Sequence, residues 1–236
     1  MQKILFGIFA HPDDEAFGPA ATLISEVKND TELHLITLTD GGNGQNLDNY
    51  ENLGKVRLQE WHTAGNLIGA TSMRHLGYSD GTLCNIDHVK IADQIVEIIK
   101  QTVRDRSDYE IEFMSLDLNG FTGHVDHIVA SRSACLAFYR LLDAGLPMKR
   151  VRLFCWSKTD QASIDTGFVF MEPGRRDEEI DEIVDATQHL EQVYKVMQAH
   201  HTQRNDYEWM MKKRGDNLCK NHFIVIENTS RPDRES

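Results

Sequence analysis

Two short stretches of this sequence place histidine and aspartate close together. His11, Asp13 and Asp14 lie in HPDDE directly after an apolar run, and His124 and His127 lie in GHVDH after a second apolar run. Each stretch contains a pair of these residues three positions apart, a spacing that brings two side chains to one face of a helical turn. Such groups can bind a divalent metal, accept a proton, or complement the positive end of a helix.

The two stretches together favour a metal site over helix capping. Catalytic zinc takes three nitrogen or oxygen ligands from the protein and keeps one position for water. Imidazole suits zinc better than magnesium, and iron(II) or another divalent transition metal is compatible with the same groups. The spacing leaves open which three residues bind, since five or six candidates compete.

The pattern of apolar residues predicts the elements that bring these stretches together. Strand-like runs occur at 3–10, 33–39, 73–76, 111–116, 151–156, 167–171 and 222–227. Helical patterns occur at 16–28, 51–68, 88–104 and 125–142. This alternation predicts an α/β fold, with a Rossmann-like, mostly parallel sheet flanked by helices. Ligands of such sheets gather beyond the carboxyl ends of the strands, where HPDDE and GHVDH both fall.

The pattern changes after about residue 150. Shorter strand-like pieces are followed by a helical region at about 186–213 and by the strand near 222–227. These features predict a mixed C-terminal extension of the sheet. Because the sequence has no repeat, low-complexity segment or linker, we expect residues 1–236 to form one domain, with a flexible tail at about 228–236.

The amino-acid composition argues against some classes of binding partner. Acidic residues outnumber basic ones by 37 to 25, giving a formal net charge of −12, and no basic stripe offers a surface for nucleic acid. No apolar run approaches the roughly 18 residues of a membrane span, and no secretory signal is recognisable. The four cysteines are scattered, as in a protein with reduced thiols. We therefore expect a cytoplasmic protein without nucleic-acid or membrane partners. The sequence contains no signal that indicates the oligomeric state.

Six motifs extend this interpretation across almost the whole chain. They are AHPDDEAFGPAATL (10–23), TLTDGGNG (37–44), VRLQEWHTAGNLIG (56–69), LGYSDGTL (76–83), GHVDH (123–127) and AHHTQ (199–203). In content and order they resemble the PIG-L/LmbE family of zinc-dependent N-acetylglucosaminyl deacetylases. The resemblance is specific, because it pairs AHPDDE with a distant GH-x-DH.

The resemblance implies a role for each residue of the two stretches. His11, Asp14 and His127 would be the zinc ligands, and Asp13 would be the general base. His124 would stabilise the developing oxyanion and could act as an acid.

The sequence departs from the family pattern at two positions. Val125 stands where the family commonly has proline, and valine can occupy an early helical position. Gly42 stands where the family commonly has glutamate, which removes a carboxylate near the expected mouth of the site. The second change bears on the substrate rather than on the chemistry.

Three further residues are candidate substrate contacts, each with an alternative. Arg57 could instead form a surface ion pair with Glu60, one helical turn away. Asp80 could hydrogen-bond a sugar hydroxyl or merely form a turn, and His200 could be a buried structural histidine. The loops that carry residues 40–46 and Asp80 are expected to determine substrate specificity, because βα loops form the walls of such sites.

These features together predict a zinc-dependent hydrolase that removes the acetyl group from a small N-acetylglucosamine-type substrate, an amino sugar or glycoconjugate. Two alternatives stay open: a zinc amidase that acts on another N-acyl compound, and a noncatalytic module that binds sugar or metal. A base at Asp13 and an acid at His124 favour catalysis, since metal binding alone would require neither.

Overall fold

The computed structural model describes residues 1–121, 123–161 and 174–228. Its strands are β1 (Gln2–Phe9), β2 (Glu32–Thr39), β3 (Ser72–Tyr78), β4 (Tyr109–Leu116), β5 (Met148–Cys155), β6 (Glu182–Asp185) and β7 (Lys220–Glu227). Within the described residues they form one seven-stranded sheet in the order β3-β2-β1-β4-β5-β7-β6. Strands β1 to β5 are parallel, whereas β7 pairs antiparallel with β5 and with β6. The predicted fold class is confirmed.

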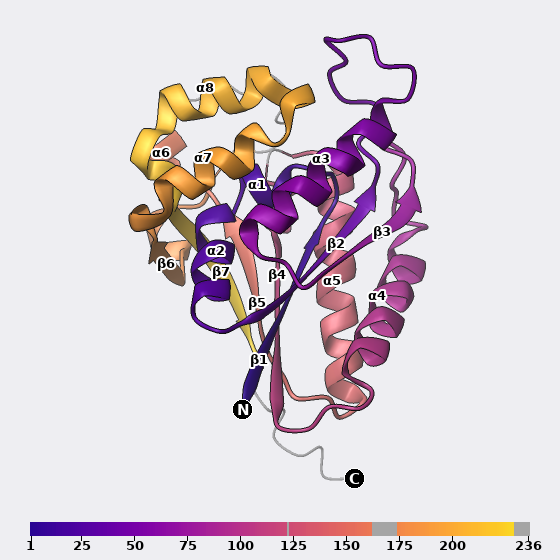
Figure 1. The fold of residues 1–236 in the computed structure, drawn as a ribbon. Helices are drawn as coiled ribbons and strands as arrows, with labels where there is room; N and C mark the ends of the chain where they lie inside the picture. Colours follow the sequence, from indigo (N-terminus) through magenta and orange to yellow (C-terminus); the bar gives the residue numbers. More distant parts are fainter. Residues whose placement is uncertain (122, 162–173, 229–236) are drawn as a thin grey trace.

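Helices cover both faces of this sheet (Figure 1). The α-helices are α1 (Asp14–Phe17), α2 (Ala20–Lys28), α3 (Leu53–Ile68), α4 (His88–Val103), α5 (Val125–Asp143), α6 (Lys158–Gln161), α7 (Leu190–Gln198) and α8 (Arg204–Arg214). One core layer includes residues of α2, α3 and α7, and the other includes residues of α4 and α5. Helix α8 follows α7 at the end of the sheet where β1 finishes (Figure 1).

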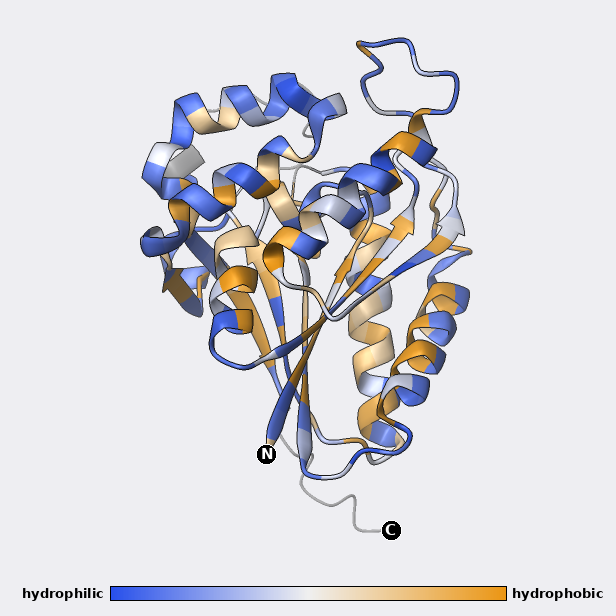
Figure 2. Cartoon of the chain, viewed as in Figure 1, coloured by the Kyte–Doolittle hydropathy of each residue, from blue (hydrophilic) through white to orange (hydrophobic). Residues whose placement is uncertain are grey.

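The burial of apolar side chains explains why these segments form these elements. Ile4, Leu5 and Ile8 of β1 are fully buried, as expected for a central parallel strand that is covered on both faces. Ile91 and Ile95 of α4 repeat at helical spacing and are also fully buried. Figure 2 shows the same contrast, with apolar residues along the inner strands and polar residues on the outer surfaces of the helices.

The order of the strands creates a crevice beside β1. The chain runs outward from β1 to β2 and β3, and then returns to place β4 on the other side of β1. The loops that follow β1 and β4 therefore leave the sheet on either side of a topological switch point, where ligands of such folds bind. HPDDE and GHVDH are in these two loops and in the helical turns that follow them.

Several predicted elements differ in the structure. The helix predicted at 16–28 is divided at Gly18 and Pro19, where proline lacks the amide hydrogen of a continuous helix. The helical region predicted at 186–213 is two helices, α7 and α8, separated by a short 3-10 turn at His201–Gln203. Strand β6 was not among the predicted strands. The strand predicted at 167–171 lies outside the described residues, as does the predicted tail beyond residue 228.

Among the described residues, no helix is both long enough and apolar enough to cross a bilayer. Cys84, Cys135, Cys155 and Cys219 are free thiols, as their scattered spacing predicts. Burial raises the pKa of Cys135 and of Cys155 to about 12, so both are unreactive at neutral pH.

Candidate metal centre and active site

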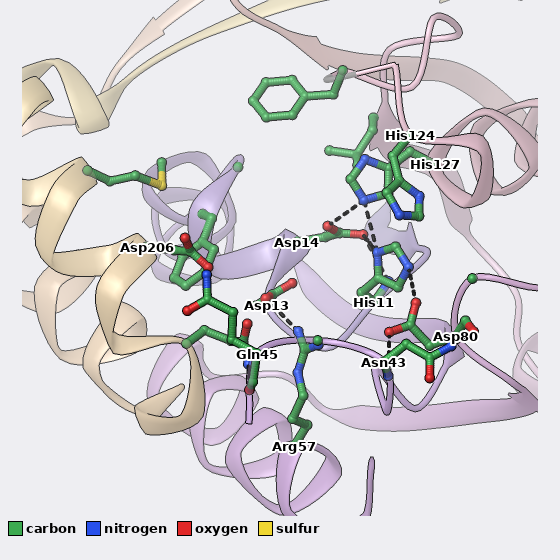
Figure 3. A pocket seen from close by; sticks show the side chains of 18 of the residues that line it. His11, Asp13, Asp14, Asn43, Gln45, Arg57, Asp80, His124, His127 and Asp206 are labelled. Carbon is green, nitrogen blue, oxygen red and sulfur yellow. Dashed lines mark hydrogen bonds and ion pairs between the residues drawn. The ribbon is translucent and has the colours of Figure 1, made fainter. Parts of the chain in front are cut away.

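Three side chains, those of His11, Asp14 and His127, converge where the loop after β1 meets the start of α5 (Figure 3). His11 Nδ1 lies 2.9 Å from His127 Nε2, and Asp14 Oδ1 lies 3.2 Å from the same nitrogen. Asp14 Oδ2 lies 3.9 Å from His11 Nδ1. Two nitrogens and a carboxylate oxygen at such close range suit a divalent transition metal.

The hydrogen bonds of the two histidines leave lone pairs directed at this point. His127 Nδ1 lies 3.0 Å from the Gly120 carbonyl, which can only accept, so Nδ1 carries the hydrogen and Nε2 is free to bind. His11 Nε2 lies 3.0 Å from Asp80 Oδ1 and 3.3 Å from Asp126 Oδ2, so its hydrogen points away from Nδ1. Metal-binding histidines are typically held in this way. The residues therefore fit a metal ion.

Asp80 orients His11 through one carboxylate oxygen and is held by the other. Its Oδ2 accepts the backbone N–H of Asn43 at 2.9 Å. Both oxygens are engaged by protein groups, whereas the sequence offered Asp80 as either a candidate substrate contact or a turn-forming residue. Asp80 lines the pocket, but its contacts make it a residue that positions a candidate metal ligand.

Asp126 contacts a candidate metal ligand, and the sequence patterns had given it no separate role. Its side chain is buried, and it accepts the backbone N–H groups of Gly81 at 2.8 Å and Leu83 at 3.1 Å. Asp126 thereby ties the loop after β3 to the start of α5, and it also contacts His11. Its place inside GHVDH was the available signal.

Asp14 is held as an anion by its surroundings. Its Oδ2 accepts the backbone N–H groups of Ala10 at 3.0 Å and His11 at 2.9 Å. Burial alone would raise the pKa of Asp14, but the charge and hydrogen bond of His127 and the charge of His11 hold it well below its usual range. An ionised carboxylate is the form that binds a metal.

Asp13 has a different environment from its neighbour. Its backbone φ is 133°, a strained value for a residue with a side chain. Burial raises the pKa of Asp13 to about 6, although the charge of Arg57 opposes the shift. A carboxylate with such a pKa can accept a proton near neutral pH. The two adjacent aspartates are therefore not equivalent.

Arg57 is buried and holds the loops after β1 and β2 in place beside the site. Its guanidinium donates to the Gly41 carbonyl at 2.7 Å, to the Pro12 carbonyl at 2.8 Å and to Asp13 Oδ2 at 2.6 Å. The alternative of a surface ion pair with Glu60 is wrong, because only 4% of Arg57 is exposed. Arg57 lines the pocket, yet these three contacts already use most of its donors.

The glycine-rich loop after β2 wraps around this guanidinium. A Cβ atom on Gly41 would lie 2.6 Å from Arg57 Cζ, and one on Gly44 would clash with Arg57 Nη1. Gly41 also has a φ of 66°, which favours glycine. The glycines thus allow the loop to lie against Arg57, while Asn43 and Gln45 of the same loop line the pocket.

His124 presents a hydrogen-bond donor beside the candidate ligands. Its Nδ1 accepts the backbone N–H of Asp126 at 3.2 Å, which places the hydrogen on Nε2. Burial lowers the pKa of His124, and the nearby His127 and His11 lower it further. A neutral imidazole with a donor at Nε2 suits the stabilisation of a developing negative charge.

His200 is not placed to contact a substrate. Its side chain is fully buried, and its Nε2 lies 2.9 Å from Oε1 of Glu15, which is also fully buried. The predicted contact is replaced by a structural pair that reaches the site indirectly, because Glu15 Oε2 accepts the backbone N–H of Asp13 at 3.2 Å. Glu15 was not among the predicted site residues.

The candidate ligands open into a pocket of about 550 Å³. Its polar part contains the histidines and aspartates drawn in Figure 3. The apolar part is lined by Phe17, Leu116, Phe121, Trp156, Trp209 and Met210. A volume of this size accommodates a small organic molecule.

Comparison with known proteins finds relatives of this chain in sequence and in fold. A 1D-myo-inositol 2-acetamido-2-deoxy-α-D-glucopyranoside deacetylase from a Nocardioides species is 27% identical, and the match covers 86% of this chain and 83% of that protein. The solved structure of N,N'-diacetylchitobiose deacetylase from Pyrococcus horikoshii has a TM-score of 0.68 at 19% identity, over 96% of this chain and 84% of that one.

A second solved structure shows that the fold by itself does not decide the reaction. The 4-carboxy-2-hydroxymuconate hydratase from Pseudomonas putida has a TM-score of 0.67 at 15% identity, over 99% of both chains. The family model for GlcNAc-PI de-N-acetylases matches residues 6–138, which is more than half of the 236 residues. This chain therefore belongs to the PIG-L family of GlcNAc-PI de-N-acetylases.

Proposed function

We propose that this protein is a metal-dependent hydrolase that removes the acetyl group from a small N-acetylglucosamine-type substrate. The observation that carries the proposal is the presence of Asp13 and His124 in the same pocket as the three converging side chains of His11, Asp14 and His127. Membership of a de-N-acetylase family and the deacetylase name of the Nocardioides relative support the same reaction.

His11, Asp14 and His127 would hold the metal, and zinc suits a set of two nitrogens and one oxygen. A metal ion bound there supplies Lewis acidity toward the amide carbonyl and acidifies water. The hydrogen bonds from His127 Nδ1 to Gly120 and from His11 Nε2 to Asp80 turn the opposite nitrogen of each ring toward the metal position, and metal binding requires that nitrogen to be deprotonated.

Asp13 is the proposed general base. Its pKa of about 6 leaves it mostly ionised at neutral pH and still able to take a proton from the attacking water. The hydrogen bond from Arg57 Nη2 to Asp13 Oδ2 fixes the orientation of the carboxylate. The proton that Asp13 accepts can then be delivered to the departing amine.

His124 is the proposed oxyanion donor. Its Nε2–H is the hydrogen left for a ligand once Nδ1 has accepted from Asp126. A hydrogen bond to the carbonyl oxygen that strengthens as negative charge develops lowers the barrier for water attack. This division of roles requires no covalent intermediate between enzyme and substrate.

The reaction is tested by incubating the metal-loaded protein with N-acetylglucosamine, its methyl glycosides and matched N-propionyl and N-butyryl compounds. We expect acetate and free amine to appear in equal amounts, with loss of activity in the chelated protein and in Asp13→Asn. A preference for the longer acyl groups would identify a different amidase. Binding of these sugars without release of any acid would indicate a noncatalytic module.

A further inference from the structure

Helix α8 forms the wall of the pocket that lies opposite Asp80 (Figure 3). Asp206, Trp209 and Met210 of this helix line the pocket. Asp206 and Trp209 are three positions apart, a spacing that brings both side chains to one face of the helix. The family model ends at residue 138, so the part of the chain that defines the family does not include this wall.

The carboxylate of Asp206 lies in the pocket without a protein partner. Among the residues that the structure describes, none forms a hydrogen bond or an ion pair with it. Burial raises the pKa of Asp206, whereas the charge of Arg57 opposes that shift. Asp206 is also in the first turn of α8, where the helix dipole stabilises a negative charge. A carboxylate that is partly removed from water is stabilised further by a donor or a positive charge, which a ligand can supply.

Asp206 differs in this respect from the other aspartates that line the pocket. Asp13 accepts a hydrogen bond from an arginine, and Asp14 accepts two backbone N–H groups. Asp80 accepts one backbone N–H and contacts a candidate metal ligand. A metal ion bound beside Asp14 would offset negative charge on that side of the pocket. Among the described lining residues, Asp206 is thus the aspartate left for a charged group of the ligand.

The basic residues of α8 contact other groups or solvent. They are Arg204, Lys212, Lys213 and Arg214. Arg204 Nη1 lies 2.7 Å from Asp48 Oδ2, and the two lysines are exposed. The Arg214 guanidinium lies 5.0 Å from the centroid of the Trp156 ring. Arg214 is eight positions after Asp206, which corresponds to roughly 12 Å along the helix axis, so its charge is not placed against that carboxylate.

Trp209 offers an aromatic face next to this carboxylate. It is 37% exposed and lines the pocket. Arg214 lies over the ring of Trp156, but within the described part of the chain no lysine or arginine lies over the ring of Trp209. A protonated amine is attracted to the face of a tryptophan ring and forms a charge-assisted hydrogen bond with a carboxylate. A neutral hydroxyl gains less from either group, so this wall suits an amine better than an alcohol.

We propose that Asp206 and the face of Trp209 bind a protonated amine that the substrate carries on its aglycone, so that glycosides with a cationic aglycone are preferred. The inference rests on the proposed deacetylase function, because it assigns the other end of the same pocket. The acetamide lies at the candidate metal ligands, and the ammonium group pairs with Asp206 on the opposite wall. Asp206 is therefore a specificity-determining residue.

Matched glycosides of N-acetylglucosamine test the proposal. The 2-aminoethyl and 2-hydroxyethyl glycosides differ by an ammonium group against a hydroxyl, and the 3-aminopropyl and 3-hydroxypropyl glycosides form a second pair with a longer reach. At pH 7.5 the wild type should favour the amine of at least one pair by about tenfold in kcat/KM, mainly through KM. Asp206→Asn should bring that ratio close to one. Glu208→Gln, which removes one charge from an exposed position of the same helix, should leave the ratio unchanged.

Binding is measured separately by tryptophan fluorescence, since Trp156 and Trp209 line the pocket. Wild-type protein that prefers neither amine over its matched alcohol would overturn the proposal, even if acetate release confirms the deacetylase function. An Asp206→Asn variant with the wild-type ratio would overturn it as well, because the preference would then come from other charges. If no protein releases acetate but wild type binds an amine more tightly than its alcohol and Asp206→Asn does not, the deacetylase function fails and the assignment of Asp206 stands.

Discussion

Replacing His200 with leucine is expected to destabilise the protein strongly, because the change leaves Glu15 as a buried charge without its partner. His200 Nε2 lies 2.9 Å from Glu15 Oε1, and the side chains of both residues are 0% exposed. Removing one member of a buried ion pair typically costs about 3–5 kcal/mol. For a chain of this size, that loss of unfolding free energy corresponds to a Tm lowered by roughly 6–20 °C.

The same change should also slow the reaction. Glu15 Oε2 accepts the backbone N–H of Asp13, whose φ of 133° needs support from its surroundings. When Glu15 shifts, the carboxylate of Asp13 is no longer held in place, and a displacement of this kind can lower kcat by roughly 10- to 100-fold. Metal content should be unchanged, because His200 does not contact any candidate ligand in the structure.

Thermal unfolding by circular dichroism and steady-state kinetics on the metal-loaded protein measure both effects. His201→Leu is the matched control, since the neighbouring histidine is 58% exposed beside Asp48 and should alter neither Tm nor kcat. The double variant Glu15→Gln/His200→Leu should be more stable than His200→Leu, because it has no ionised carboxylate to bury. A His200→Leu protein that melts within about 2 °C of wild type would refute the reasoning.

Three further predictions concern the metal centre. Asp80→Ala should weaken metal binding about 10- to 100-fold in chelator competition, because His11 loses the nearer of the two carboxylates that orient it; an unchanged affinity would contradict this role. Asp13→Asn should retain the metal and slow turnover about 10²–10⁴-fold, whereas Asp14→Asn should lose the metal; equal metal content in the two variants would remove the distinction. In metal-free protein, burial by itself lowers the pKa of His11, but hydrogen bonds to Asp126 and Asp80 raise it from 6.5 to about 10. Its stabilising contribution is then complete below pH 6.5 and is lost as pH rises through about 10, which denaturant unfolding over this range would reveal as falling stability; rising stability would argue against a charged His11.

The central sheet could be predicted because its signal is local and strong. The apolar run of β1 is buried on both faces, and Ile91, Ile95 and Ile99 of α4 repeat at the spacing of a helix face. The elements after about residue 150 were harder to predict. The helical pattern at 186–213 gives no sign of the break before α8, where the burial of His200 against Glu15 overrides local propensity. Strand β6 has only four residues and lies at the sheet edge. An alternation of apolar and polar residues over so few positions cannot be recognised in the sequence.

The candidate ligands could be predicted because His11, Asp14 and His127 belong to two compact motifs at the ends of strands. The residues that support them could not, since their roles depend on contacts between distant segments. Arg57 reaches Asp13 across 44 positions, and Asp126 meets Gly81 across 45. Neither helical nor strand periodicity carries information about such pairs, which form only when the loops meet at the switch point.

The central claim is that one metal ion held by His11, Asp14 and His127 supports hydrolysis, with Asp13 as the base. The most direct test is a titration of chelated protein with zinc, in which bound metal and acetate release from an N-acetylglucosamine glycoside are followed together. We expect wild-type activity to rise in proportion to metal and to level off near one ion per chain, while Asp13→Asn binds the same amount and stays almost inactive. Full acetate release by metal-free wild type, or by metal-loaded Asp13→Asn, would contradict the account.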